Sequence, residues 1–179
     1  MKGSLYIAAA ALVAAVGGAA PASAQCSGNG TCSTTNTASV TVGTVVNLEM
    51  SSSSTTLTAP APADFAAGFV ADVGPTFVVH ANQNWTMAVK AAASNPTSWS
   101  YTGTKGGSKP IGDLEWSVAV DGTFAALTGS NATVASSASS TDDTAVSLFF
   151  KTLYSSDYSS VRNRPGAYSL PVVFTLSAP

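Results

Sequence analysis

The sequence predicts an all-β domain, an antiparallel β-sandwich of about seven to nine strands. Two observations carry the prediction: short segments alternate apolar and polar residues, and turn-forming residues separate these segments at regular spacing. Side chains of a strand point alternately to its two faces, so each segment offers one face to a core and one to solvent. A third observation is that no convincing helical periodicity follows Ala24. A small barrel is the second architecture that fits this pattern.

Residues 1–24 have the pattern of a secretory signal peptide. Met1-Lys2 is followed by an apolar run from Leu5 to Val16, and Ala22-Ser23-Ala24 matches an A-x-A cleavage signal. The apolar run is shorter than the roughly 20 residues that a membrane-spanning helix needs. We therefore expect an exported protein of the periplasm, cell surface or extracellular space. A lipoprotein anchored at Cys26 is the alternative, which Gln25 disfavours because a small residue normally precedes the anchoring cysteine.

The composition indicates one domain with an unusually weakly charged surface. Charged residues make up 9% of the chain, against about 25% in typical soluble domains. Residues 1–24 hold one of the seven basic and none of the nine acidic residues, so the chain after Ala24 has a net charge of −3. This balance argues against a nucleic-acid surface, which needs clustered Lys and Arg. A surface so poor in charge suits a protein that associates with copies of itself.

Residues 25–37 form the expected leader, which we expect to be flexible because Gly, Asn, Ser and Thr follow one another there without periodicity. It contains the two cysteines of the chain, Cys26 and Cys32. In an exported protein an even number of cysteines favours a disulfide. The loop between them is short, so the bond would contribute about 2 kcal/mol at most. An intermolecular bridge is the alternative; a metal site lacks a nearby histidine.

The segment Ala38–Met50, ASVTVGTVVNLEM, opens the expected domain of residues 38–179. Apart from Thr44 its even positions are apolar, while its odd positions are mostly polar, as in a half-buried strand. At about 3.3 Å per residue such a strand would extend roughly 40 Å, twice the usual length. It must therefore bend at Gly43, or part of it must leave its own domain and pair elsewhere.

Polar and turn-forming residues divide the rest of the chain. We expect a loop over residues 51–63 and a turn at Gly74-Pro75, and residues 64–70 fit a short strand or a single turn equally well. Pro171 lacks a backbone donor, so the last strand should have an unpaired edge there. The expected strands are centred on residues 77–81, 85–91, 99–101, 114–120, 146–150 and 168–176, with shorter ones after Gly122 and around Val134.

No residue pattern indicates catalysis, so we expect no enzyme and no cofactor. His80 is the only histidine, and no G-x-S-x-G motif accompanies it, which makes a Ser-His-Asp triad improbable. Asp113 and Glu115 lie two residues apart on one face, but glycosidase carboxylates normally come from different strands across a cleft. We expect this pair on a solvated outer face.

Metal binding has equally little support. Zinc needs three or four nitrogen or sulfur ligands, and one histidine with two leader cysteines does not supply them. Asp142, Asp143 and Asp157 could contribute oxygen ligands to calcium, but no spaced acidic motif joins them. We therefore expect no metal.

Aromatic residues divide into two groups. Trp85 and Trp116 lie on apolar faces and are expected in the core. Four others lie near loops, where they either close the ends of the sandwich or form a platform for stacking on a sugar. These residues are Trp99, Tyr101, Tyr154 and Tyr158.

The order of leader, alternating N-terminal strand and alternating C-terminal strand resembles that of bacterial pilin and spore-coat-type surface subunits. The segments ASVTVGTVVNLEM and AYSLPVVFTLSAP carry this resemblance. It implies an Ig-like sandwich in which the N-terminal strand of one subunit completes the sheet of the next. Two features differ from chaperone–usher pilins: their disulfide usually links well-separated strands, and they often have a tyrosine where this chain has Ala178.

Two functions follow as hypotheses. The favoured one is a fimbria-like or coat-like structural subunit that associates with copies of itself or a surface partner by strand addition, in which alternate side chains fill pockets. The alternative is a monomeric module that binds polysaccharide through the aromatic residues above. The residues expected to fill pockets are Val40, Val42, Val46, Leu48 and Met50.

Overall fold

The structure is a computed structural model that describes Thr31 and residues 37–179. The chain divides into two units, residues 1–41 and residues 42–179, and the fold below is that of the second unit. The expected signal peptide, Cys26 and Cys32, and nearly all of the leader lie outside the described residues. Within the described part, no helix is long and apolar enough to cross a membrane.

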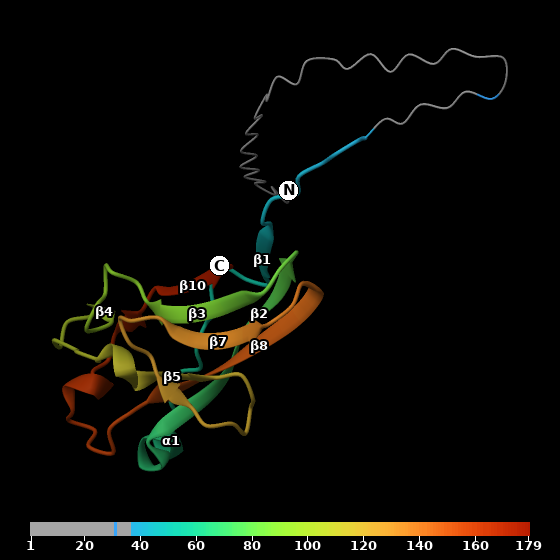
Figure 1. The fold of residues 1–179 in the computed structure, drawn as a ribbon. Coiled ribbons are helices and arrows are strands. Elements are labelled where there is room, and N and C mark those ends of the chain that lie inside the picture. The colour runs from blue at the N-terminus through green and yellow to red at the C-terminus, as the bar shows by residue number, and fades with distance from the viewer. Residues whose placement is uncertain (1–30, 32–36) are drawn as a thin grey trace, which may run out of the picture. The chain divides into compact units, whose positions relative to one another are not determined.

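The described residues are mostly β-structure, and every paired strand is antiparallel (Figure 1). This confirms the predicted all-β, antiparallel class. One sheet has the order β1-β2-β8-β5-β6, a second has the order β10-β3-β7, and β4 pairs with β9. The strands are β1 (Val46–Met50), β2 (Phe69–Ala81), β3 (Trp85–Ala91), β4 (Ser100–Thr102), β5 (Leu114–Ser117), β6 (Ala125–Ala126), β7 (Ala132–Ser137), β8 (Thr141–Leu153), β9 (Ala167–Ser169) and β10 (Val172–Ser177).

The two larger sheets share one hydrophobic core. In β3 every second residue from Trp85 to Ala91 is buried, which is the alternation that the sequence predicted. The buried faces of β2 and β8 belong to the same cluster as that of β3. Phe77 of β2 and Phe174 of β10 pack with ring centroids 4.6 Å apart, so this contact joins the two sheets. Trp85 and Trp116 both lie in the core, as expected.

Residues 64–70, which fitted a short strand or a single turn equally well, overlap a short helix, α1 (Pro62–Ala67). The prediction that no helix follows Ala24 is therefore wrong. Pro62 starts the helix, where a missing N–H costs nothing. Asp64 Oδ2 accepts a hydrogen bond from the Ala61 N–H at 2.7 Å. Gly68, at φ 84°, ends the helix in the left-handed conformation.

The expected turn at Gly74-Pro75 is also absent, because β2 continues through it with a register shift between Val73 and Thr76. An extra residue bends one strand and leaves part of it without a ladder partner, which accommodates proline. A Cβ on Gly74 would lie 2.9 Å from Cε2 of Phe150 and 3.0 Å from the Leu148 carbonyl oxygen. Glycine is required here because β8 and a core ring approach the backbone closely.

Two connections differ in length from their predictions. β7 and β8 extend into residues 136–143, for which the polar sequence predicts a loop. The predicted strand over residues 114–120 ends at Ser117, and Val118 and Val120 are 50% and 63% exposed. Short 3-10 turns, η1 (Ile111–Asp113) and η2 (Val161–Asn163), lie within residues 103–113 and 155–166, which the sequence predicts to be loops.

Candidate functional site

Only the second half of the alternating segment 38–50 forms a strand. β1 pairs with β2 of the same chain, from Val46 opposite Ala81 to Met50 opposite Phe77. Residues 37–45 have no assigned secondary structure. The single long strand of the sequence prediction is therefore divided at Val46.

The side chains of the five expected pocket-filling residues have different surroundings. Leu48 packs against the core. Val46 and Met50 are partly exposed, at 37% and 43%. Val40 and Val42 are 87% and 75% exposed and belong to no strand. Strand addition by these residues stays a prediction, and Val40 and Val42 are the two whose apolar side chains remain uncovered.

The turn between β2 and β3 holds the chain where β1 begins. Asn82 Oδ1 accepts from the Val45 N–H at 2.9 Å, and Asn82 Nδ2 donates to the Gly43 carbonyl at 2.8 Å. Gln83 Nε2 donates to Thr44 Oγ1 at 3.0 Å. The ladder stops at Val46 because β2 ends at its partner Ala81, and residues 43–45 bond instead to these side chains and to the Asn82 N–H.

β10 lies at the edge of its sheet and pairs with β3 alone. The single strand predicted over residues 168–176 is divided at Leu170-Pro171 into β9 and β10, which belong to different sheets. Pro171 therefore lies in neither strand, although β10 has the predicted unpaired edge. The inward side chains of β10, Val172, Phe174 and Leu176, pack against the core but stay only half-buried. An edge strand presents a row of unpaired backbone groups. This side of the sandwich therefore lacks both a hydrogen-bonding partner and cover for apolar side chains.

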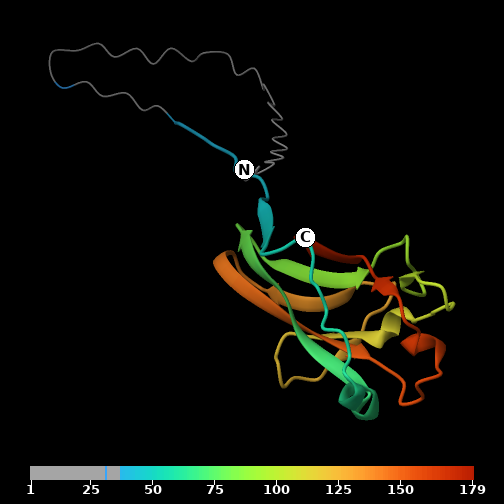
Figure 2. The same cartoon turned by 180° about the vertical axis from the view of Figure 1, so that it is seen from behind.

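A groove of about 930 Å³ lies beside β10. Its opposite wall is the segment that connects β1 with α1, which runs along the open side of the domain (Figure 2). Asp72 holds this wall, since its Oδ1 accepts from the N–H and hydroxyl of Thr58 at 3.1 and 2.6 Å. Apolar core side chains also line the groove: Leu57, Leu114, Phe150, Leu170, Val172 and Phe174.

Charged side chains cluster at one end of the groove. Lys109, 2% exposed, lies 3.5 Å from Asp113 Oδ2, bonds the Leu153 carbonyl, and stands 4.3 Å from the centre of the Tyr154 ring. Arg162 Nη1 lies 3.3 Å from Asp113 Oδ1. Burial raises the pKa of Asp113, against the opposing charges of Lys109 and Arg162, and burial lowers the pKa of Lys109.

The structure corrects the prediction for Asp113, while Glu115 is partly exposed. Asp113 is 3% exposed and pairs with the buried Lys109 and the exposed Arg162, so it does not lie on a solvated outer face. Its i,i+4 relation to Lys109 was visible in the sequence. The pairing with Arg162 was not, because a loop 49 positions away supplies that residue.

The four expected platform aromatics do not share one exposed face. Trp99 is 8% exposed, and its Nε1 donates to the Pro110 carbonyl at 3.1 Å. Tyr101 packs against Tyr168, with ring centroids 4.9 Å apart. Tyr154 and Tyr158 both pack against Phe65, with ring centroids 5.6 and 5.0 Å from that of Phe65. Sugar binding by these residues stays a prediction, which a glycan array would test.

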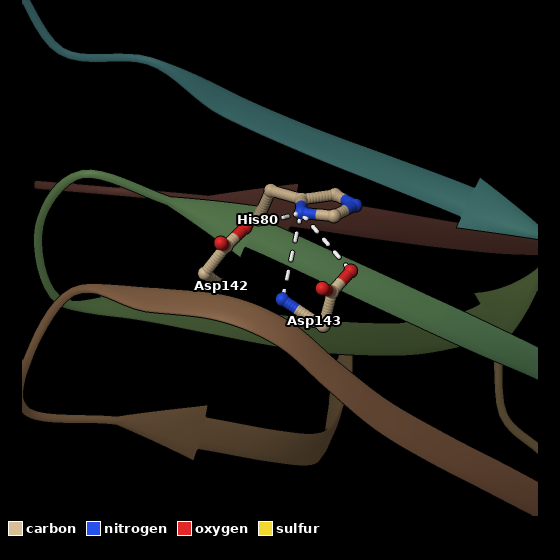
Figure 3. A group of neighbouring side chains, drawn as sticks. All are labelled: His80, Asp142 and Asp143. Carbon is tan, nitrogen blue, oxygen red and sulfur yellow. Dashed lines mark hydrogen bonds and ion pairs between the residues drawn. The ribbon is translucent and has the colours of Figure 1, made fainter.

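His80 lies on β2 beside two consecutive carboxylates of β8 (Figure 3). Its Nδ1 is 3.0 Å from Asp142 Oδ1 and 3.7 Å from Asp143 Oδ1. Consecutive strand residues normally point to opposite faces. Here Asp143 has φ 58°, a left-handed conformation that brings its carboxylate to the same imidazole. The hydrogen bond to Asp142 raises the pKa of His80, and the charges of Asp143 and Glu49 add to this effect while burial opposes it.

Among the described residues, His80, Asp142 and Asp143 are one group close enough to hold a cation together. Asp157 is the third carboxylate that could contribute an oxygen ligand to calcium. Its Oδ1 instead accepts hydrogen bonds from the N–H and hydroxyl of Ser159 at 2.8 and 2.7 Å. These bonds lower the pKa of Asp157. The side chains of Asp142 and Asp143 are 92% and 78% exposed, so water already solvates both.

Comparison with known proteins shows a likeness of fold to solved structures. No protein-family model matches the sequence, and no curated protein matches it. The fold is similar to that of a chain in a solved structure of a chaperone–usher pilus, with a TM-score of 0.46 and 14% identity. The match covers 85% of this chain and 96% of the other.

Proposed function

We propose that the protein is a non-enzymatic, exported structural subunit with an Ig-like sandwich, which assembles on the cell surface by β-strand addition. The open edge of β10 beside the groove supports this proposal. An extended segment laid there would pair with the unpaired backbone of β10 and cover the half-buried Val172, Phe174 and Leu176.

The donor in this proposal is the segment that precedes β1 in a second copy. β10 has six residues, and residues 38–43, ASVTVG, offer a segment of the same length. Ala38, Val40 and Val42 alternate with small or polar residues, so one face of the added strand would be apolar. Each valine would contribute about 1.5–3 kcal/mol if fully buried. Leu48 and Met50 are not donors in this scheme, because β1 pairs within its own subunit.

The test removes the two exposed valines without touching β1. The V40S/V42S double variant should weaken association by roughly 100-fold or more, since two buried valines are lost. Light scattering or native mass spectrometry of the full chain would measure the assembly size. The matched control, S39A/T41A, changes the opposite face of the same segment and should assemble normally. Polymers of wild-type length from V40S/V42S would contradict the proposal.

A further inference from the structure

The groove beside β10 is not electrically neutral. Three of the seven basic residues in the chain line it, Lys109, Arg162 and Arg164. Asp113 pairs with the first two, and the charge of Arg164 acts on Asp157. Among the described residues, no Asp or Glu lines the groove itself. Three cations against these two carboxylates leave an excess positive charge of one at the end of the groove next to β9.

Two polar atoms at this groove also lack partners. Thr152 is 2% exposed and lines the groove, and its Oγ1 has no hydrogen-bond partner among the described residues. Arg164 Nε is likewise buried and unpaired within the described part of the chain. A buried donor without a partner costs free energy. An oxygen acceptor with negative charge would satisfy these donors and the excess charge together.

The chain's own N-terminal segment cannot supply that acceptor side chain. Glu49 is the first acidic residue of the sequence, and it lies in β1, which pairs within its own sheet. Residues 38–45 would bring apolar side chains to the groove and leave its excess positive charge uncompensated. The acceptor groove and the donor segment of identical copies therefore match in shape and polarity but not in charge.

We propose that the preferred occupant of this groove is an extended segment of a different protein that alternates apolar side chains and carries a carboxylate beside Arg162 and Arg164. This inference rests on the proposed strand addition. It specifies the kind of donor segment that the groove beside β10 would bind most tightly. The residues at the cationic end precede β10 in the chain, so an antiparallel added strand has its C-terminal end there. Homotypic pairing is then the weaker mode of assembly and heterotypic pairing the stronger.

Two peptides that differ at one residue test whether a negative charge strengthens binding to the groove. The first is residues 38–46, acetylated and amidated so that its ends are neutral, and the second is the same peptide with Val46→Glu. Each would be titrated, with a fluorescent label, into the full chain carrying V40S and V42S, which keeps the groove free of a second copy. We expect the acidic peptide to bind roughly tenfold more tightly, the usual effect of a hydrogen bond to a charged group. Raising the salt concentration should shrink this difference.

Substitutions in the groove test whether its basic residues cause the preference for the acidic peptide. R162Q/R164Q should abolish the preference for the acidic peptide while the neutral peptide binds as before. K151Q is the matched control, because Lys151 lies between the rings of Phe69 and Phe124 and does not line the groove. R164Q alone keeps the Arg162–Asp113 pair and serves if the double variant is unstable.

The outcomes separate this inference from the proposed function. Equal binding of both peptides overturns the inference and leaves strand addition standing. A preference for the acidic peptide that survives R162Q/R164Q and R164Q also overturns it, because the charge would then act elsewhere. Failure of both peptides to bind overturns strand addition at this groove and the inference with it.

Discussion

The two ends of the domain have the same sequence pattern and different structural outcomes. Residues 168–176 and residues 38–50 both alternate apolar and polar side chains. The first region forms two strands, β9 and β10, in place of the single predicted one, and both have partners within the chain. In the second, only Val46–Met50 pairs, and residues 37–45 have no strand partner among the described residues. Alternation therefore shows that a segment can form a strand, while the supply of a neighbouring edge decides whether it does.

Leu48→Asp should have the largest effect, because it tests whether β1 belongs to its own domain. Leu48 is partly buried against the core, and a carboxylate there would lose part of its hydration without gaining a partner. We expect the free energy of unfolding to fall by about 3 kcal/mol. Urea unfolding would measure this. Val42→Asp is the control in the uncovered half of the segment and should leave the stability of the monomer unchanged. Equal stabilities for both variants would remove the contrast between the two halves.

Phe174→Ala should have the next largest effect, because it tests how far β10 already completes the core. The ring packs on Phe77 at 4.6 Å but remains half-buried. We expect a loss of about 2 kcal/mol, less than for a fully buried phenylalanine. Val173→Ala lies on the opposite face and should cost less than about 0.5 kcal/mol. A loss as small for Phe174 as for Val173 would mean that β10 adds little to the core without an added strand.

Asn82→Ala addresses the point where the two halves of residues 38–50 separate. Removing this side chain deletes the hydrogen bonds to Val45 and Gly43. We expect stability to fall by about 1 kcal/mol. The Val45 amide should also exchange faster with deuterium, which NMR would detect. Asn84→Ala, in the same turn, should change neither quantity. Unchanged exchange at Val45 in Asn82→Ala would show that the anchor lies elsewhere.

The smallest expected effect is the pH dependence of the β1–β2 pairing. His80 lies opposite Asn47 of β1, and its folded-state pKa is raised above the ordinary value of 6.5. Its stabilising contribution is therefore complete below pH 6.5 and is lost as the pH rises through the folded-state pKa. The midpoint of thermal unfolding should fall slightly between pH 5.5 and 8 relative to a His80→Gln variant. NMR titration of His80 would give the pKa directly. A value below 6.5 would contradict this expectation.

Much of the fold follows from local pattern, and the exceptions have identifiable causes. Strands such as β3 were predictable because a single face of each is buried. The helix α1 buries no residue, so no apolar periodicity marked it, although Pro62, Asp64 and Gly68 provide start and stop signals. Gly74-Pro75 has the composition of a turn, yet a bulge against β8 accommodates both residues. The contact of Asp113 with Arg162 joins distant loops and has no local signature.

By itself, the sequence determined the all-β class, the core tryptophans, the low charge and the alternating ends, because each depends on residue chemistry repeated along a short segment. Tertiary structure alone decided that the ladder of β1 starts at Val46, that the far edge of β10 is open, and that three cations meet in one groove. Pairing and burial depend on which segments become neighbours in space, and a local pattern does not carry that information.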